Sequence, residues 1–99
     1  MRVSAGTMLI LSRTTGESII IGDLSVTVTG IFNKKVQLGI VNQKEKSGFS
    51  TLEGKLEAEI SIRENVKIKI IQIRGRQVRL GIKAPPGTLI LRDKLLEQE

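Results

Sequence analysis

The side chains best suited to chemistry in this chain are two arginines at the ends of strand-like segments. Arg13 follows the apolar run MLILS, and Arg92 follows TLIL near the other end of the sequence. A guanidinium group is always charged, and its rigid fork of N–H donors fits the oxygens of a phosphate or carboxylate. Charged residues on an outer strand can also serve only to prevent aggregation. Anion binding and edge protection are therefore both open for Arg13 and Arg92 on this evidence.

Catalytic chemistry is poorly supported by the composition. The sequence has no His, Cys or Tyr, so Ser–His and Cys–His nucleophiles and the usual zinc ligands are excluded. It also has no G-x-x-x-x-G-K-[ST] or G-x-G-x-x-G run to hold phosphates. Glu57 and Glu59 are close in sequence, but on a helix they would point to different faces, and we interpret them as solvated charges. We therefore expect no enzyme, no catalytic or metal site and no cofactor.

The charge balance favours an acidic partner. Sixteen Lys and Arg residues against ten Asp and Glu residues give a formal net charge of +6. Nucleic acid is the commonest acidic partner of a small basic protein. Since the only aromatic side chains are Phe32 and Phe49, base stacking is disfavoured, and contacts must come from Arg, Lys, main-chain and aliphatic groups. A basic surface that only confers solubility is the alternative.

The sequence gives no sign of a membrane or export segment. No apolar run approaches the roughly 20 residues that cross a bilayer, and MRVSAGTMLIL lacks the long apolar region of a signal peptide. The absence of Cys fits a reducing compartment. We expect a cytoplasmic protein with no membrane partner, in which residues 1–7 are a flexible extension.

The elements that must position the two arginines come from an internal duplication. At an offset of 42, residues 18–40 align with residues 60–82 without a gap, and VQLGI at 36–40 returns as VRLGI at 78–82. Apolar and glycine positions coincide in this alignment, for example Ile20 with Ile62. Such a match in both period and glycine indicates a repeat.

Each copy has the pattern of a kinked β-hairpin. Apolar and polar residues alternate, as in SVTVT and NVKIKI, which is typical of strands with one face on a core. The alternation slips by one residue after Val28 and again after Ile70, which predicts a β-bulge in each copy. Turns are expected at residues 33–34 and 75–76, where Asn33 and Gly75 tolerate a positive φ.

The segment between the copies is predicted to contain a short helix. Ser50 and Glu53 have the spacing of a capping box, and Leu52 and Leu56 would share one helix face, although Gly54 weakens the helix. A second short helix is expected in DKLLEQE, at the end of the sequence.

The chain has room for one domain, because a unit of about 40 residues rarely stabilises itself. We therefore expect a single all-β domain over residues 8–99, a small antiparallel sheet or barrel-like sandwich with the two short helices. Repeat one covers residues 8–43, the linker with the inserted helix covers 44–59, and repeat two covers 60–99. A strand precedes the first copy only, and a strand follows the second copy only.

Two segments resemble a known family. MLILSRTTGESIIIGD, residues 8–23, is similar to the opening of the carbon storage regulator (CsrA/RsmA) family of bacterial RNA-binding proteins. GRQVRLGIKAPPGTLILRDKL, residues 75–95, resembles the last two strands of the family and the start of its C-terminal helix. The APPGTLILRD stretch looks closest to the divergent RsmN-type members.

The resemblance implies a fold and a function. Family members are small intertwined homodimers of five-stranded chains, and each RNA site combines the first strand of one protomer with the last strand of the other. The sites take GGA sequences in hairpin loops of mRNA or small RNA, and binding over a ribosome-binding site represses translation. Carried over to this sequence, the expected RNA-binding residues are Leu11, Ser12, Arg13, Ala84, Pro85, Ile90, Leu91, Arg92 and Asp93.

The sequence departs from the family pattern in two places. The position after Arg13, usually basic in the family, is Thr14, which weakens phosphate contact. In the first copy, the segment where a last strand and its arginine would stand reads QKEKSGFSTLE, with Ser50 at the clamp position. We therefore expect a pseudo-dimer within one chain, with one RNA site built from the strands around Leu11 and Ile90. The alternative treats residues 24–59 as an insertion and gives an ordinary protomer that forms a homodimer.

A translational regulator is thus the leading interpretation, with mRNA, small regulatory RNA and a protein antagonist as partners that the family resemblance suggests. A protein-interaction module that uses its sheet edge, and a general basic nucleic-acid binder, are the alternatives. Lys67 and Lys69, which alternate with apolar residues, are interpreted as the wet face of a strand.

Overall fold

The computed structural model describes residues 8–44 and 49–92 of the chain, and all of the regular structure in this part is β-strand. Alternating apolar and polar residues explain this, since each strand presents one side to a core and one to water. The strands are β1 (Leu9–Thr14), β2 (Ser18–Ile21), β3 (Leu24–Phe32), β4 (Lys35–Asn42), β5 (Phe49–Lys55), β6 (Glu59–Arg63), β7 (Val66–Arg74), β8 (Gln77–Lys83) and β9 (Ile90–Arg92).

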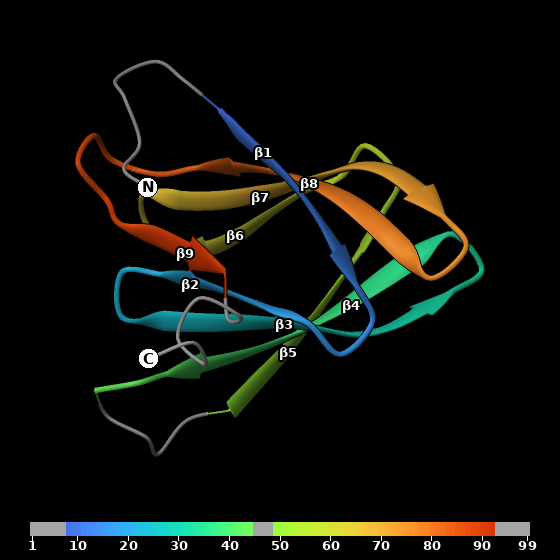
Figure 1. The fold of residues 1–99 in the computed structure, drawn as a ribbon, viewed down its shortest axis with the longest axis horizontal. Helices are drawn as coiled ribbons and strands as arrows, with labels where there is room; N and C mark the ends of the chain where they lie inside the picture. The colour runs from blue at the N-terminus through green and yellow to red at the C-terminus, as the bar shows by residue number, and fades with distance from the viewer. Residues whose placement is uncertain (1–7, 45–48, 93–99) are drawn as a thin grey trace.

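The strands form two antiparallel sheets (Figure 1). One sheet has the order β1-β8-β7-β6, and the other has the order β5-β4-β3-β2-β9. The predicted all-β class is confirmed. Among residues 8–44 and 49–92 there is no helix long and apolar enough to span a membrane.

Strands are exchanged between the two halves of the chain. Repeat one supplies the hairpin strands β2, β3 and β4, and repeat two supplies β6, β7 and β8. However, β1 pairs with β8 rather than with its own half, with Leu11 opposite Leu80. In return β9 pairs with β2, with Ile20 opposite Leu91. Figure 1 shows β1 crossing away from β2 to reach β8.

The core lies between the two sheets and draws equally on both repeats. The inward positions are β-branched residues or leucine, and burying each such side chain contributes roughly 1.5–3 kcal/mol. The largest fully buried side chains are Ile19, Val26, Val28, Val36 and Leu38 from repeat one, and Ile68, Ile70, Val78, Leu80 and Ile82 from repeat two.

The predicted bulges and turns are present. The β3–β4 register shifts between Val28 and Gly30, and the β7–β8 register shifts between Ile70 and Gln72. At the β3–β4 turn Asn33 has a φ of 47° and the next residue a φ of 65°. These positive values are those of a two-residue hairpin turn whose twist matches the flanking strands.

The predicted inserted helix is wrong, because residues 49–55 form strand β5 on the outer side of β4. Leu52 and Gly54 face the core side, at the spacing of two that a strand requires. Gly54 is needed there because Ile60 packs on it: a Cβ built on Gly54 would lie 2.6 Å from Ile60 Cδ1. The helical interpretation relied on Leu56, which instead lies exposed in the turn after the strand.

The expectation that repeat two lacks a first strand is also wrong. β5 pairs with β4 as β1 pairs with β8, so it occupies the first-strand position of repeat two. In contrast, β6 is the outer strand of its sheet, and no strand in the described part of the chain pairs with it beyond β7. Within residues 8–44 and 49–92, β6 is thus an outer strand at the place where a last strand of repeat one would pair.

The gapless alignment of the repeats also needs one correction. Ile19 lies opposite Val26, and Ile60 lies opposite Ile68, so the equivalent residues of β2 and β6 are offset by 41 rather than 42. The extra residue is Ile62, at a register shift between Ser61 and Arg63. Ile20 and Ile62 are therefore not equivalent. The expected extension at 1–7 and the expected C-terminal helix at 93–99 lie outside the described residues.

Candidate nucleic-acid interface

The expected site joins the edges of both sheets. β1 is an outer strand of the four-stranded sheet, and β9 is an outer strand of the five-stranded sheet. Strand β2 connects them, because Arg13 of β1 hydrogen-bonds the carbonyl of Ser18, and the next residue, Ile19, lies opposite Arg92 of β9. The ends of β1 and β9 that carry the two arginines thus lie beside consecutive residues of β2, Ser18 and Ile19.

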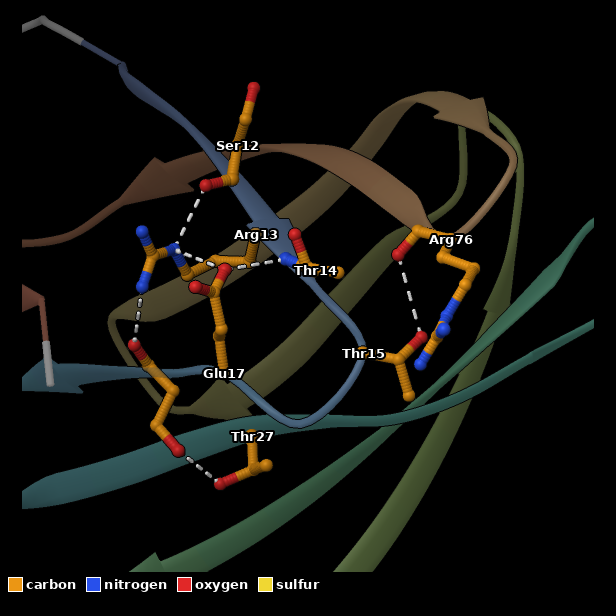
Figure 2. Close-up of polar contacts among 8 residues, drawn as sticks. Ser12, Arg13, Thr14, Thr15, Glu17, Thr27 and Arg76 are labelled. Carbon is orange, nitrogen blue, oxygen red and sulfur yellow. Dashed lines mark hydrogen bonds and ion pairs between the residues drawn. The ribbon is translucent and has the colours of Figure 1, made fainter. Parts of the chain in front are cut away.

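Arg13 is buried, with only 6% of its surface exposed. It lies on the inward side of β1, in line with Leu9 and Leu11. Its Nε donates to the carbonyl of Ser12 at 2.8 Å, and its Nη1 donates to the carbonyl of Ser18 at 3.4 Å (Figure 2). The guanidinium therefore holds the β1–β2 corner together from inside. We expected Arg13 at the surface. However, Leu9, Leu11 and Arg13 alternate along β1, and this spacing places Arg13 on the same inward side as the two leucines.

Glu17 completes this corner. Its Oε1 accepts a hydrogen bond from the backbone N–H of Thr14 at 2.8 Å and lies 3.8 Å from Arg13 Nε (Figure 2). Gly16, with a φ of 95°, lets the chain reverse tightly between the two strands. The backbone N–H of Thr15 donates to the carbonyl of Arg76 at 3.1 Å, which ties the corner to the β7–β8 turn. The corner is thus fixed to both sheets.

The outward side of β1 presents Ser12 beside basic side chains that sequence reasoning did not place in the site. Ser12 lies opposite Arg79, and a polar hollow of about 210 Å³ is lined by Ser12, Gln72, Arg74, Gln77 and Arg79. The pattern QVRLG contained the signal, because buried Val78 and Leu80 require Gln77 and Arg79 to face outward. This hollow offers donors to phosphate or base edges next to β1.

The β9 side of the site has an apolar base. Ile90 is buried and Leu91 is half-buried, and β9 continues the sheet beyond β2. Arg92 is placed by its backbone at the end of this strand, and Asp93 lies outside the described residues.

Ala84 and Pro85 lie at the other end of β1, away from the two arginines. Leu9, at the start of β1, lies opposite Ile82, directly before the loop that carries Ala84. Thr88 fixes this loop, because its backbone N–H and its hydroxyl both donate to the carbonyl of Pro85, at 3.1 and 2.7 Å. The structure thus brings Arg13 and the Arg92 backbone to neighbouring residues of β2, and it places Ala84 and Pro85 in the loop that leads into β9.

The equivalent position in the other sheet has no arginine. Arg13 lies opposite Val78, and Gly54 lies opposite Val36, the equivalent valine of repeat one. Ile60 fills the space beside Gly54. Since no last strand follows repeat one in the described residues, this second edge lacks both the arginine and its partner strand.

The fold and this site define a small all-β domain made of two interlocked repeats with a basic edge. The sequence model of CsrA, described as a global regulator protein family, matches residues 8–47 and 51–99, and the chain belongs to this family. The match in two segments supports a duplicated unit, and the second segment begins inside β5. The family is one of regulators and not of enzymes.

Individual relatives match about half of the chain. A translational regulator CsrA of Helicobacter pylori is 48% identical over 46 residues, which cover 46% of this chain and 60% of the relative. Those of Brachyspira hyodysenteriae and Geobacter metallireducens are 38% and 39% identical, over 48% and 44% of this chain and 57% and 56% of the relatives. No solved structure gives a significant match.

Proposed function

We propose that the chain is a post-transcriptional regulator that binds GGA-containing hairpin loops in mRNA leaders or small RNAs. Binding over a ribosome-binding site then represses translation in the cytoplasm. Family membership and the similar proteins, which are named translational regulators, support this proposal. The observation that carries it is the meeting of β1 and β9 at β2, because the family resemblance assigns the RNA site to a first and a last strand.

Within this site we assign different roles to the two arginines. Arg92, at the end of β9, contacts the RNA directly, together with the outward side of β1 and the Ala84–Pro85 loop. Arg13 acts as a positioning residue, because its guanidinium is engaged by the carbonyls of Ser12 and Ser18 and is nearly all buried. Main-chain groups of β1 and β9 are the expected readers of the GGA bases.

One chain is proposed to carry one site and to act as a pseudo-dimer. The exchange of β1 and β9 between the two repeats supports this, because it supplies within one chain the contacts that two protomers would otherwise share. The second edge, with Gly54 in place of the arginine, supports a single site.

Titration of the protein with a short GGA hairpin tests both points. We expect one RNA per chain by calorimetry and the mass of one chain by light scattering. Two equivalent RNAs per chain would overturn the single site, and a stable dimer would support the homodimer alternative. Equal affinity for a hairpin with a scrambled loop would replace the specific regulator by a general basic binder.

One observation favours a second candidate function. β6 is the outer strand of its sheet, and such an edge can accept a strand from a protein partner. A protein partner that binds at β6 would leave the β1–β9 site accessible, because β1 is at the opposite edge of the sheet. An RNA-free pull-down in which a β6 substitution, Ser61→Pro, abolishes capture of a defined partner would support this module, since proline removes a ladder donor.

A further inference from the structure

The outer face of the four-stranded sheet carries three lysines that the proposed loop-binding site does not use. Lys67 and Lys69 alternate with buried residues of β7, and Lys83 follows buried Ile82 at the end of β8, so all three side chains face outward. Lys67 lies directly opposite Lys83. We call Lys67, Lys69 and Lys83 the lysine patch.

The fold itself does not require these lysines. In the five-stranded sheet the equivalent positions, 42 residues earlier, are Ser25, Thr27 and Val41. Ser25 lies opposite Val41 as Lys67 lies opposite Lys83. At these three positions, the same backbone framework therefore carries uncharged side chains in one sheet and lysines in the other.

The lysine patch is also electrostatically unfavourable for the free protein. Like charges directly opposite each other on a sheet are destabilising. Two carboxylates offset part of this charge: Glu59 Oε2 lies 2.9 Å from Lys83 Nζ, and Glu64 lines a hollow together with Lys67 and Lys83. The hydrogen bond from Lys83, with the nearby charges of Lys83, Lys67 and Lys69, lowers the pKa of Glu59 below its usual 4.5. Three lysines against two carboxylates leave a net positive face, which the phosphates of a polyanion would neutralise.

The position of the lysine patch links it to the proposed site on two sides. A hollow of about 450 Å³ is lined by Lys67 and Lys83, by Glu64 and Asn65 of the β6–β7 turn, and by Ala84 and Pro85 of the loop that leads to β9. Toward β1, Arg79 continues the outward basic side chains of β8 and lies opposite Ser12. The lysine patch thus shares a surface with β1 and with the Ala84–Pro85 loop.

We propose that the lysine patch binds the phosphate backbone of the RNA that flanks the recognised loop. This inference rests on the proposed function and extends it: β1 and β9 read the loop, and β7 and β8 hold the flanking strand or stem without reading its sequence. Phosphate contacts of this kind add affinity and fix orientation. Because only one sheet carries the patch, flanking RNA is held on one face of the protein.

The test uses RNAs that share one GGA loop and differ in what flanks it. The first has a minimal stem, the second a long stem, and the third a minimal stem with a single-stranded tail. Binding is measured over a range of salt concentrations for the wild-type chain and for the triple variant Lys67→Ser, Lys69→Thr, Lys83→Val, which installs the residues of repeat one. The single variant Lys67→Ser is the second probe if the triple variant fails to fold.

We expect the wild-type chain to bind an extended RNA more tightly than the minimal hairpin. The triple variant should lose this gain and retain its affinity for the minimal hairpin. The slope of log K against log salt for the extended RNA should fall by about 2 to 3, at roughly 0.9 per duplex phosphate or 0.7 per single-strand phosphate released. A gain with the long stem assigns the patch to duplex phosphates, and a gain with the tail assigns it to a single strand.

A matched control removes three lysines elsewhere. The substitutions Lys34→Asn in the β3–β4 turn, Lys35→Thr at the start of β4 and Lys55→Val on β5 lower the net charge by the same amount, and this variant should keep the gain. Equal losses in both variants would reduce the effect to net charge and overturn the inference. Equal affinity of the wild-type chain for all three RNAs would also overturn the inference. The same holds if polyglutamate binding depends on the lysine patch as strongly as RNA binding does. Failure of the minimal hairpin to bind the wild-type chain would instead contradict the proposed function.

Discussion

Arg13 and Gly54 occupy equivalent positions in the two sheets. Arg13 lies opposite Val78 in the β1–β8 pair, and Gly54 lies opposite Val36 in the β5–β4 pair. The duplicated framework therefore presents the same place twice, once with a buried guanidinium and once with no side chain. Ile60 takes up the space at the second place.

Replacement of Gly54 by arginine is expected to destabilise the fold without creating a second RNA site. A Cβ at this position would lie 2.6 Å from Ile60 Cδ1, so Ile60 must move, and overpacking of this kind costs about 1–3 kcal/mol. Urea unfolding measures the cost, with the exposed Thr51→Arg on the same strand as the control. An RNA stoichiometry that rises from one to two in Gly54→Arg would show that the missing arginine alone had silenced the second edge.

Removal of Arg13 is expected to destabilise the β1–β2 corner. Arg13→Ala leaves the carbonyls of Ser12 and Ser18 without this donor and opens space in the interior, at a cost of about 1–3 kcal/mol. Arg13→Lys should not restore the stability, because an ammonium group lacks the planar fork that reaches two carbonyls. The free energy of unfolding of Arg79→Ala, an exposed arginine on the neighbouring strand, should change by no more than about 0.5 kcal/mol. Unchanged stability of Arg13→Ala would contradict the positioning role.

Arg92→Ala is expected to weaken RNA binding. If Arg92 holds an RNA phosphate or base edge, its loss should cost about 1–3 kcal/mol in affinity for the minimal GGA hairpin, with a shallower salt dependence. Calorimetry or fluorescence anisotropy measures this change. Arg63→Ala, at the end of β6 and on the opposite edge of its sheet from β1, is the control and should bind normally. Equal affinities for Arg92→Ala and wild type would remove Arg92 from the site.

The Glu59–Lys83 pair is expected to give a small pH dependence of stability in acid. The pKa of Glu59 is lowered in the folded chain, mainly by the hydrogen bond from Lys83. Its ionised form is therefore favoured by folding, and the contribution is present above the usual pKa of 4.5 and is lost as the pH falls through the lowered value. Thermal denaturation between about pH 3 and 7 should show a flatter profile for Glu59→Gln than for the wild-type chain. Identical profiles would mean that the pair does not couple to folding.

Much of the fold follows from local patterns in the sequence. Alternation predicted the hairpin strands, and its slip after Val28 and Ile70 predicted both bulges, because an extra residue in a ladder reverses every side chain beyond it. The sequence did not predict β5, because this outer strand has mostly exposed side chains and therefore lacks the alternation of a half-buried strand. Its core residue Gly54 was interpreted only as a weak point of a helix. Only the packing of Ile60 from the next strand explains Gly54.

The sequence predicted which strands form the candidate site, but not the burial of Arg13 or the presence of Arg79 beside it. The meeting of β1 and β9 depends on strand exchange, which the family resemblance implied and the strand pairing shows. The burial of Arg13 depends on carbonyls of Ser12 and Ser18 that converge only in three dimensions. Arg79 was overlooked because strand pairing, and not proximity in sequence, places it opposite Ser12.

The strand exchange within one chain affects how the number of complete sites depends on protein concentration. In a two-chain version of this architecture, subunits separate on dilution, so the share of working sites depends on protein concentration. Here covalent connection holds β1 against β8 and β9 against β2 at a fixed effective concentration. Under the proposed function, each newly made chain carries a complete RNA site even when only a few copies exist in a cell, and the amount of RNA bound scales with the abundance of the chain.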